Sequence, residues 1–155
     1  MNKNYLHIYN NLINYTRNKD LYKNLNRNDN FSDRLTLFLF HFSFFLKNYK
    51  NEENKNILQE IYDFNFRQLE LSIREIGYGD QSINKKMKDY INLFHAMVSE
   101  IHFWEKMDKI EKTKKISLFL SDFGNIEELL NYFNDFYMNL SKKTLNSYLK
   151  SVSNP

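Results

Sequence analysis

The scarcity of residues that interrupt regular structure constrains this fold more than any other feature. The 155 residues include only three glycines and one proline, and apolar residues recur at helical spacing over long stretches. Such a pattern indicates an all-α protein with few or no strands. We predict a single compact multi-helix domain of about six to eight helices over residues 1–150, followed by a frayed tail over residues 151–155.

The composition sets limits on the core and on the partners. The chain is long enough to bury a core without disulfides, and it has no cysteine, which fits a reducing compartment. Aromatic residues make up 17% of the sequence, so we expect a core rich in Phe and Tyr. The formal charge of +3 does not by itself indicate a nucleic-acid partner.

Neither a secretory signal nor a membrane span is expected. Residues 1–15 contain one lysine and no long apolar core. The longest apolar run, residues 35–46, is interrupted by Thr36, His41 and Ser43, and it is shorter than the roughly 20 residues that span a bilayer. We expect a soluble protein that at most lies at the surface of a membrane.

Periodicity and capping residues divide the chain into helices. Ser32 or Asp33 is expected to cap the second major helix, and Ser141 the last one. Asn125, with Glu128 in the capping-box position, begins another helix. The lysine-rich residues 106–115 are interpreted as a solvated connector or, alternatively, an anionic docking patch. The predicted major helices cover residues 4–17, 34–49, 57–76, 83–107, 116–123, 125–137 and 141–149.

The sharpest break in the helical pattern lies between two long helices. Gly77 follows the last periodic apolar residue, Ile76, and is expected to end the first helix in a left-handed conformation. Asp80 or Ser82 is expected to cap the next helix. We refer to residues 70–89, which surround this turn, as the corner.

Charges at the corner sit at unfavourable ends of the helix dipoles. Glu75 lies at a negative helix end, whereas Lys85, Lys86 and Lys88 lie near a positive one. One explanation is that Glu75 pairs with one of these lysines across the turn, and Lys85 with Asp89. The other is that a binding partner uses these charges.

The helix over residues 34–49 is apolar on nearly all sides. A helix without a polar face is normally buried at the centre of a domain. The alternative is that one side stays uncovered as an aromatic binding surface. His41, within this helix, is expected to be a buried, hydrogen-bonded histidine.

The usual catalytic motifs are missing. There is no thiol, no Gly-x-Ser-x-Gly, no glycine-rich phosphate loop and no His-Glu-x-x-His. His95 and His102 are two helical turns apart, too far to chelate one metal directly. We therefore expect a non-enzymatic protein without a cofactor or metal.

Three segments resemble a known family. Residues 72–80, Ser-Ile-Arg-Glu-Ile-Gly-Tyr-Gly-Asp, and residues 85–88, Lys-Lys-Met-Lys, resemble the Ser-Leu-Arg-Glu-Met-Gly-Val-Gly-Asp and Lys-Arg-Val-Lys signature of the ubiquinol-cytochrome c chaperones. Residues 34–41 resemble that family's Arg-Phe-Asp-Leu-Ile-Val-Leu-His helix, with Thr36 in place of the aspartate. The likeness covers roughly residues 20 to 105, in the same order and spacing.

The resemblance implies an all-helical assembly factor for ubiquinol-cytochrome c reductase of the respiratory chain. Its client would be newly made cytochrome b or another subunit of that complex. Work beside the ribosome, or with a small partner subunit, is also implied. A short, proline-poor member is expected to be bacterial and cytoplasmic, acting at the inner face of the inner membrane.

A client-binding surface is expected where the corner and the aromatic helix lie side by side. A membrane-protein client presents apolar helices and charged loops, so its receptor needs aromatic or Met side chains beside a few charges. The candidate residues are Arg34, Phe38, His41, Phe42, Phe45, Arg74, Glu75, Asp80, Lys85, Lys86, Lys88, Met97 and Trp104.

Two other classes of function stay open at this point. The lysines of residues 85–88 and 106–115, beside Tyr90 and Trp104, suggest a nucleic-acid- or ribosome-binding module, although no specific nucleic acid is indicated. The second is an enzyme or a haem or metal binder that uses His41, His95 or His102.

Overall fold

The computed structural model describes residues 4–25 and 27–150, and within these all of the regular secondary structure is helical, with no strand. The prediction of an all-α fold is confirmed. The seven α-helices are α1 (Tyr5–Thr16), α2 (Phe31–Tyr49), α3 (Lys55–Ile76), α4 (Asp80–Glu100), α5 (Lys109–Leu120), α6 (Ile126–Ser141) and α7 (Leu145–Lys150). Short 3₁₀ helices lie at Lys19–Leu21, Trp104–Lys106 and Ser121–Phe123. The predicted tail, residues 151–155, lies outside the described residues.

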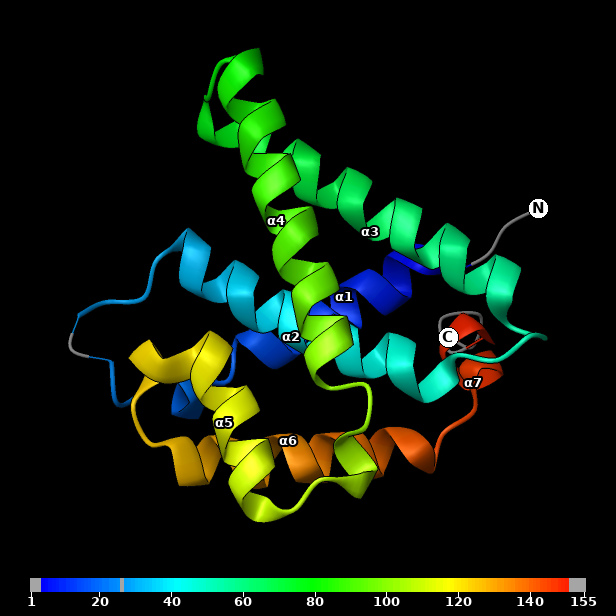
Figure 1. The fold of residues 1–155 in the computed structure, drawn as a ribbon. Helices are drawn as coiled ribbons and strands as arrows, with labels where there is room; N and C mark the ends of the chain where they lie inside the picture. Colours follow the sequence, from blue (N-terminus) through cyan, green and yellow to red (C-terminus); the bar gives the residue numbers. More distant parts are fainter. Residues whose placement is uncertain (1–3, 26, 151–155) are drawn as a thin grey trace.

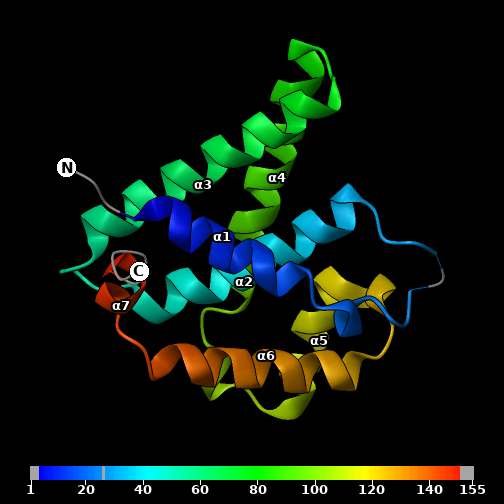
Figure 2. The same ribbon diagram turned by 180° about the vertical axis from the view of Figure 1, so that it is seen from behind.

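Helix α2 lies at the centre of the molecule. It packs against α1 on one side, against α4 on the other and against α6 along a third (Figures 1 and 2). Helices α3 and α4 form a long hairpin whose tip extends beyond the rest of the molecule (Figure 1). The corner occupies this tip, about 30 Å along α3 from its first residue.

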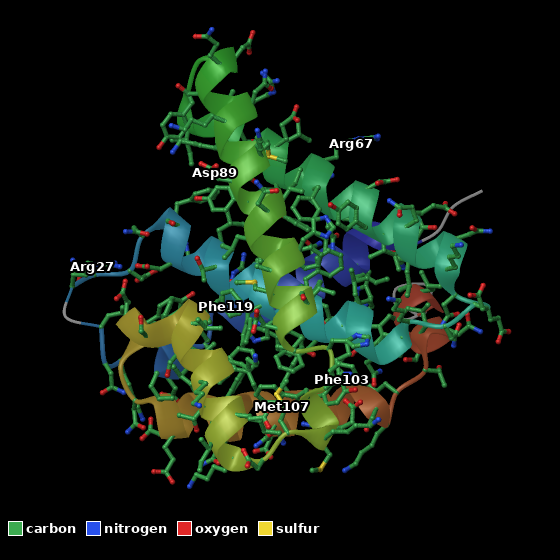
Figure 3. The ribbon with its side chains drawn as sticks, in the orientation of Figure 1. Arg27, Arg67, Asp89, Phe103, Met107 and Phe119 are labelled. Atoms are coloured by element: carbon green, nitrogen blue, oxygen red, sulfur yellow. The ribbon has the colours of Figure 1, made fainter. Side chains whose placement is uncertain are left out.

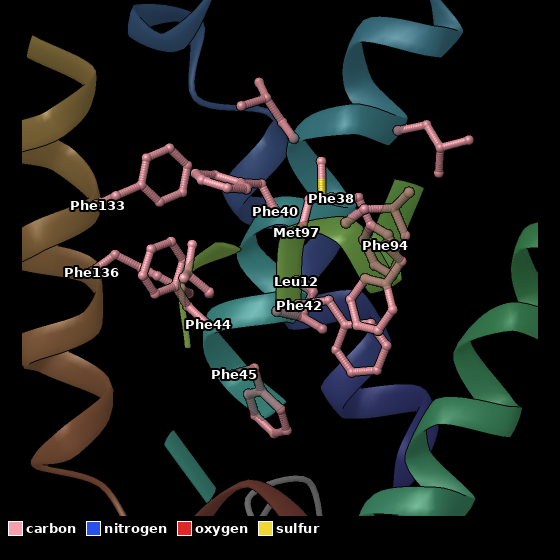
Figure 4. Close-up of a cluster of buried hydrophobic side chains, with 14 of the residues drawn as sticks. Leu12, Phe38, Phe40, Phe42, Phe44, Phe45, Phe94, Met97, Phe133 and Phe136 are labelled. Carbon is pink, nitrogen blue, oxygen red and sulfur yellow. The ribbon is translucent and has the colours of Figure 1, made fainter. Parts of the chain in front are cut away.

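The aromatic segment of α2 is buried on every side. Phe40 and Phe44 reach toward Phe133 on α6, whereas Phe42 stacks on Phe94 of α4 with ring centroids 4.9 Å apart (Figure 4). Such ring pairs are favourable beyond the area they bury. The predicted burial of this helix is confirmed, and the alternative of an open aromatic surface is wrong because three other helices cover it.

His41 is fully buried within this core, as predicted. Its Nδ1 lies 2.6 Å from the carbonyl oxygen of Leu37, and its Nε2 lies 2.7 Å from the hydroxyl of Tyr132. Because a carbonyl only accepts, Nδ1 carries the proton, and the Tyr132 hydroxyl donates to Nε2. Burial lowers the pKa of His41 to about 4, although the hydrogen bond to Leu37 opposes this. Both ring nitrogens of the neutral histidine are therefore hydrogen-bonded.

The start of α2 differs from the prediction. Asn30 caps the helix by accepting from the backbone N–H of Asp33, and the Asp33 carboxylate accepts from the backbone N–H of Asn30. This reciprocal capping box places Asp33 in the first turn rather than at the cap. Asp33 also pairs with Arg27, which holds the pKa of its carboxyl below the usual range. Ser32 is likewise inside the helix.

Later boundaries also differ. Helix α4 ends at Glu100, not near residue 107, and the chain turns so that Trp104 enters the core from a 3₁₀ helix. Residues 109–115 are the first turns of α5, capped by Asp108, rather than a connector. Asn125 caps α6 as predicted. Ser141 is the last residue of α6, and so it does not cap α7.

Candidate functional site

The turn at the corner depends on the conformation of Gly77. Gly77 has φ of 102°, the left-handed conformation that glycine adopts without steric cost, and its N–H bonds to the carbonyl of Arg74. The predicted end of the helix is confirmed. Gly79 is the N-cap of α4 and no side chain caps the helix, so neither Asp80 nor Ser82 has the predicted role.

Arg74 makes the ion pairs at the corner. Its Nη1 lies 2.9 Å from Oδ1 of Asp80 across the turn, and its Nε lies 3.2 Å from Oε2 of Glu70 one turn back. The carboxylate of Asp80 is therefore used to close the turn instead of capping α4. Within residues 4–25 and 27–150, no ion pair joins Glu75 to a lysine or Lys85 to Asp89, so the predicted pairing is wrong.

The corner exposes charges of both signs. Residues 70–89 contain four basic and four acidic side chains, so the segment carries no net charge. Lys85 and Lys88 are exposed, and the ammonium of Lys86 lies 4.5 Å from the ring centroid of Tyr78. Arg67 and Asp89 also lie on the surface of the hairpin (Figure 3). A balanced charge pattern favours contact with specific charged groups over general attraction to a polyanion.

The apolar candidates are not at the surface. Met97 and Trp104, like Phe38, Phe42 and Phe45 of α2, are at most 2% exposed and belong to the core. The tip of the hairpin extends away from α2, so the corner and the aromatic segment do not lie side by side (Figure 1). A client cannot contact this half of the predicted surface in this conformation. The buried candidates are Phe38, His41, Phe42, Phe45, Met97 and Trp104.

The other charged candidates lie elsewhere. Arg34, in the first turn of α2, pairs with Asp29 at 2.8 Å. On α5, Lys109 pairs with Glu127 and Lys115 with Glu100, which leaves these lysines with carboxylate neighbours. Two of the five lysines in residues 106–115 are thus paired with carboxylates outside this segment, one on α6 and one at the end of α4.

A groove that the sequence did not predict lies where α3 and α4 diverge. Its volume is about 870 Å³, and the end of α2 forms its floor. Apolar side chains from three helices line it, with three lysines, one glutamate and two histidines among the polar groups. The lining residues are Leu46, Lys47, Lys50, Asn51, Glu52, Lys55, Leu58, Gln59, Tyr62, Phe94, His95, Val98 and His102. Amphipathic spacing alone could not have revealed it, because the groove depends on the angle between two helices.

Hydrogen bonds hold the walls of this groove in place. The hydroxyl of Tyr62 on α3 lies 3.0 Å from Nε2 of His95 on α4. The ammonium of Lys47 donates to the carbonyl of His102 at 2.6 Å and pairs with Glu105 at 2.8 Å, which lowers the pKa of that carboxyl. These links join α3 to α4, and α2 to the segment that follows α4.

The histidines do not form a metal centre. His41 is in the core, whereas His95 and His102 are exposed. Across the described ranges, no three His, Asp or Glu side chains are placed to share a metal ion. Nor does any helix in the described part of the chain combine the length and the apolar character needed to cross a bilayer.

Comparison with known proteins connects the corner and the groove to one family. A family model described as "Ubiquinol-cytochrome C chaperone" matches residues 23–102, just over half of the chain. The chain belongs to this family. No curated protein and no solved structure matches it.

The region shared with the ubiquinol-cytochrome c chaperones covers both exposed features. It begins before α2 and ends at His102, so it includes the whole corner and every residue that lines the groove. Of the candidate site residues, only Trp104 lies outside it. Helices α5 to α7, which complete the core around α2, follow the shared region.

Proposed function

We propose that this protein is an assembly factor for ubiquinol-cytochrome c reductase that binds newly made cytochrome b. It acts by binding rather than by catalysis, and it needs no cofactor. Membership of the chaperone family is the observation that carries the proposal. Another subunit of the same complex is the alternative client.

The exposed charges of the corner are proposed to contact the client. Lys85, Lys86 and Lys88 have no carboxylate partner within 4.0 Å among the described residues. Charged side chains that stay unpaired in the free protein are available to acidic groups on loops of a membrane protein. Arg74 and Asp80 fix the turn that presents them, and Glu75 is exposed beside them.

Co-purification of cytochrome b tests the proposal. We expect cytochrome b to be recovered with the wild-type protein, and at least tenfold less with a variant in which Arg74, Lys85, Lys86 and Lys88 are changed to Ala. The matched control changes Lys114 and Lys142, which are also exposed, to Ala. Equal recovery with all three proteins would contradict the role of the corner.

A deletion strain tests the function as a whole. Without the protein, we expect the amount of assembled ubiquinol-cytochrome c reductase to fall, and the cytochrome b absorbance of membranes to fall with it. Normal accumulation of the complex would refute the proposal.

The place of action is also a proposal. We place the protein in the cytoplasm of a bacterium, at the inner face of the inner membrane, because a cytochrome b chaperone must meet its client there. Association with ribosomes or with a small partner subunit stays a prediction, which sedimentation of cell extracts at low and high salt tests.

A further inference from the structure

The groove between α3 and α4 has the features of a receptor for one helix. Leu58 and Tyr62 lie one turn apart on α3, and Phe94 and Val98 lie one turn apart on α4. Leu46 closes the floor between them. Side chains at i and i+4 form ridges on a helix, and a third helix packs by placing its own ridge between two such rows.

The charges around the groove indicate which kind of helix fits. Lys50 and Lys55 are exposed and have no carboxylate partner among the described residues, whereas Lys47 forms an ion pair with Glu105. The lining contains three lysines against one glutamate. A helix with carboxylates beside its apolar stripe would complement this lining.

The walls favour a helix over an extended peptide. No strand edge is present within residues 4–25 and 27–150, so main-chain pairing with an extended segment has no partner. The link between Tyr62 and His95 holds the two walls at a fixed separation. A groove that is already formed lowers the ordering cost of binding.

We propose that this groove holds an amphipathic helix of the client, with an apolar stripe facing the half-buried Leu46, Tyr62 and Val98, above the buried Leu58 and Phe94, and with carboxylates near Lys50 and Lys55. This inference rests on the proposed function and deepens it, since it states which part of the client is held. The corner, at the other end of the same hairpin, contacts loops.

Photocrosslinking from inside the groove tests the inference. A photoreactive phenylalanine at position 98 is compared with one at position 138, where Met138 is 56% exposed on α6. We expect position 98 to form adducts with a single segment of cytochrome b that has apolar residues at helical spacing and at least two carboxylates. Position 138 should give less than a tenth of that yield.

Charge reversal distinguishes a specific binding site from a surface that binds apolar segments non-specifically. Changing Lys50 and Lys55 to Glu should lower the adduct yield about tenfold, whereas changing Lys114 and Lys142 to Glu should not change it. Leu46→Trp, which fills the groove from its floor while the photoreactive residue stays at position 98, should abolish the adduct, with its far-ultraviolet circular dichroism unchanged from wild type. Both charge variants alter exposed positions only, so the test does not depend on a core substitution.

Several outcomes would overturn the inference. These are adducts of equal yield at both positions, adducts with a segment that lacks helical spacing or carboxylates, adducts with lipid, and adducts with a second copy of this chain. If cytochrome b co-purifies but gives no adduct from position 98, the inference fails while the proposed function stands. If an acidic amphipathic helix of a different identified protein fills the groove and cytochrome b does not co-purify, the groove assignment stands and the proposed client is wrong.

Discussion

The buried neutral His41 predicts that the protein loses stability in mild acid. In the unfolded chain a histidine binds a proton near pH 6.5, whereas in the fold the pKa of His41 is about 4. Between these values the unfolded state binds more protons, so the free energy of unfolding falls as the pH falls. From pH 7 to pH 5 this single group should remove about 2 kcal/mol.

Urea unfolding at pH 7, 6 and 5 measures this loss. The variant His41→Phe keeps His7, His95 and His102 but cannot take up a proton at position 41. We expect its free energy of unfolding to change with pH by about 2 kcal/mol less than that of wild type over this range.

Carboxylates do not account for a loss of stability between pH 7 and pH 5. The pKa of Asp33 is lowered by Arg27, and that of Glu105 by Lys47. A group with a lowered pKa contributes stability that is lost only as the pH falls through the acidic range of carboxyls, mainly below about pH 5. If wild type and His41→Phe lose stability equally between pH 7 and pH 5, the reasoning from burial is refuted.

Three further substitutions and two control substitutions test the fold. Gly77→Ala should cost about 1 kcal/mol in urea unfolding because of the left-handed φ of 102°, whereas Gly79→Ala, with φ of −71° and open space around its Cβ, should stay within about 0.5 kcal/mol of wild type. Gly124→Ala should cost more than Gly77→Ala, since a new Cβ would lie 2.1 Å from that of Asn24. Phe44→Ala should lower the free energy of unfolding by about 3 to 5 kcal/mol, and Phe103→Ala, at a 58% exposed position, by less than about 0.5; equal losses would contradict the described core.

Periodicity was sufficient to predict the class of fold and the burial of α2. The long helices α1 to α3 lie within a few residues of their predicted ranges. The reason is that apolar spacing reports directly which face of a helix is covered. The prediction that His41 is buried and hydrogen-bonded followed from the same argument, because a histidine within a buried helix needs local hydrogen-bond partners.

Caps and ion pairs were less predictable because several residues compete for each role. At the start of α2, Asn30, Ser32 and Asp33 are all good capping residues, and the reciprocal hydrogen bonds select Asn30. At the corner, Asp80 could cap α4 or pair with Arg74, and the folded turn places it against Arg74. These choices depend on backbone geometry that the sequence does not state.

The site was the least predictable part. The aromatic residues expected at the client surface are in the core. The sequence marks this helix as apolar on all sides, but it does not state whether the rest of the chain or a client covers each side. The groove arises from the divergence of α3 and α4, and its lining residues are spread over residues 46–102. No local pattern joins them.

The burial of α2 has a consequence for synthesis of the chain. Asn48, near the end of α2, donates to the carbonyl of Leu140, 92 residues later, and Phe44 packs on Phe133 of the same distant helix. At about 5 to 20 residues per second, a ribosome needs roughly 5 to 20 s to make the intervening segment. During that interval the aromatic stripe of α2 that faces α6 is uncovered. The nascent protein therefore exposes an apolar helix surface while it is being made, as the client that it is proposed to hold also does.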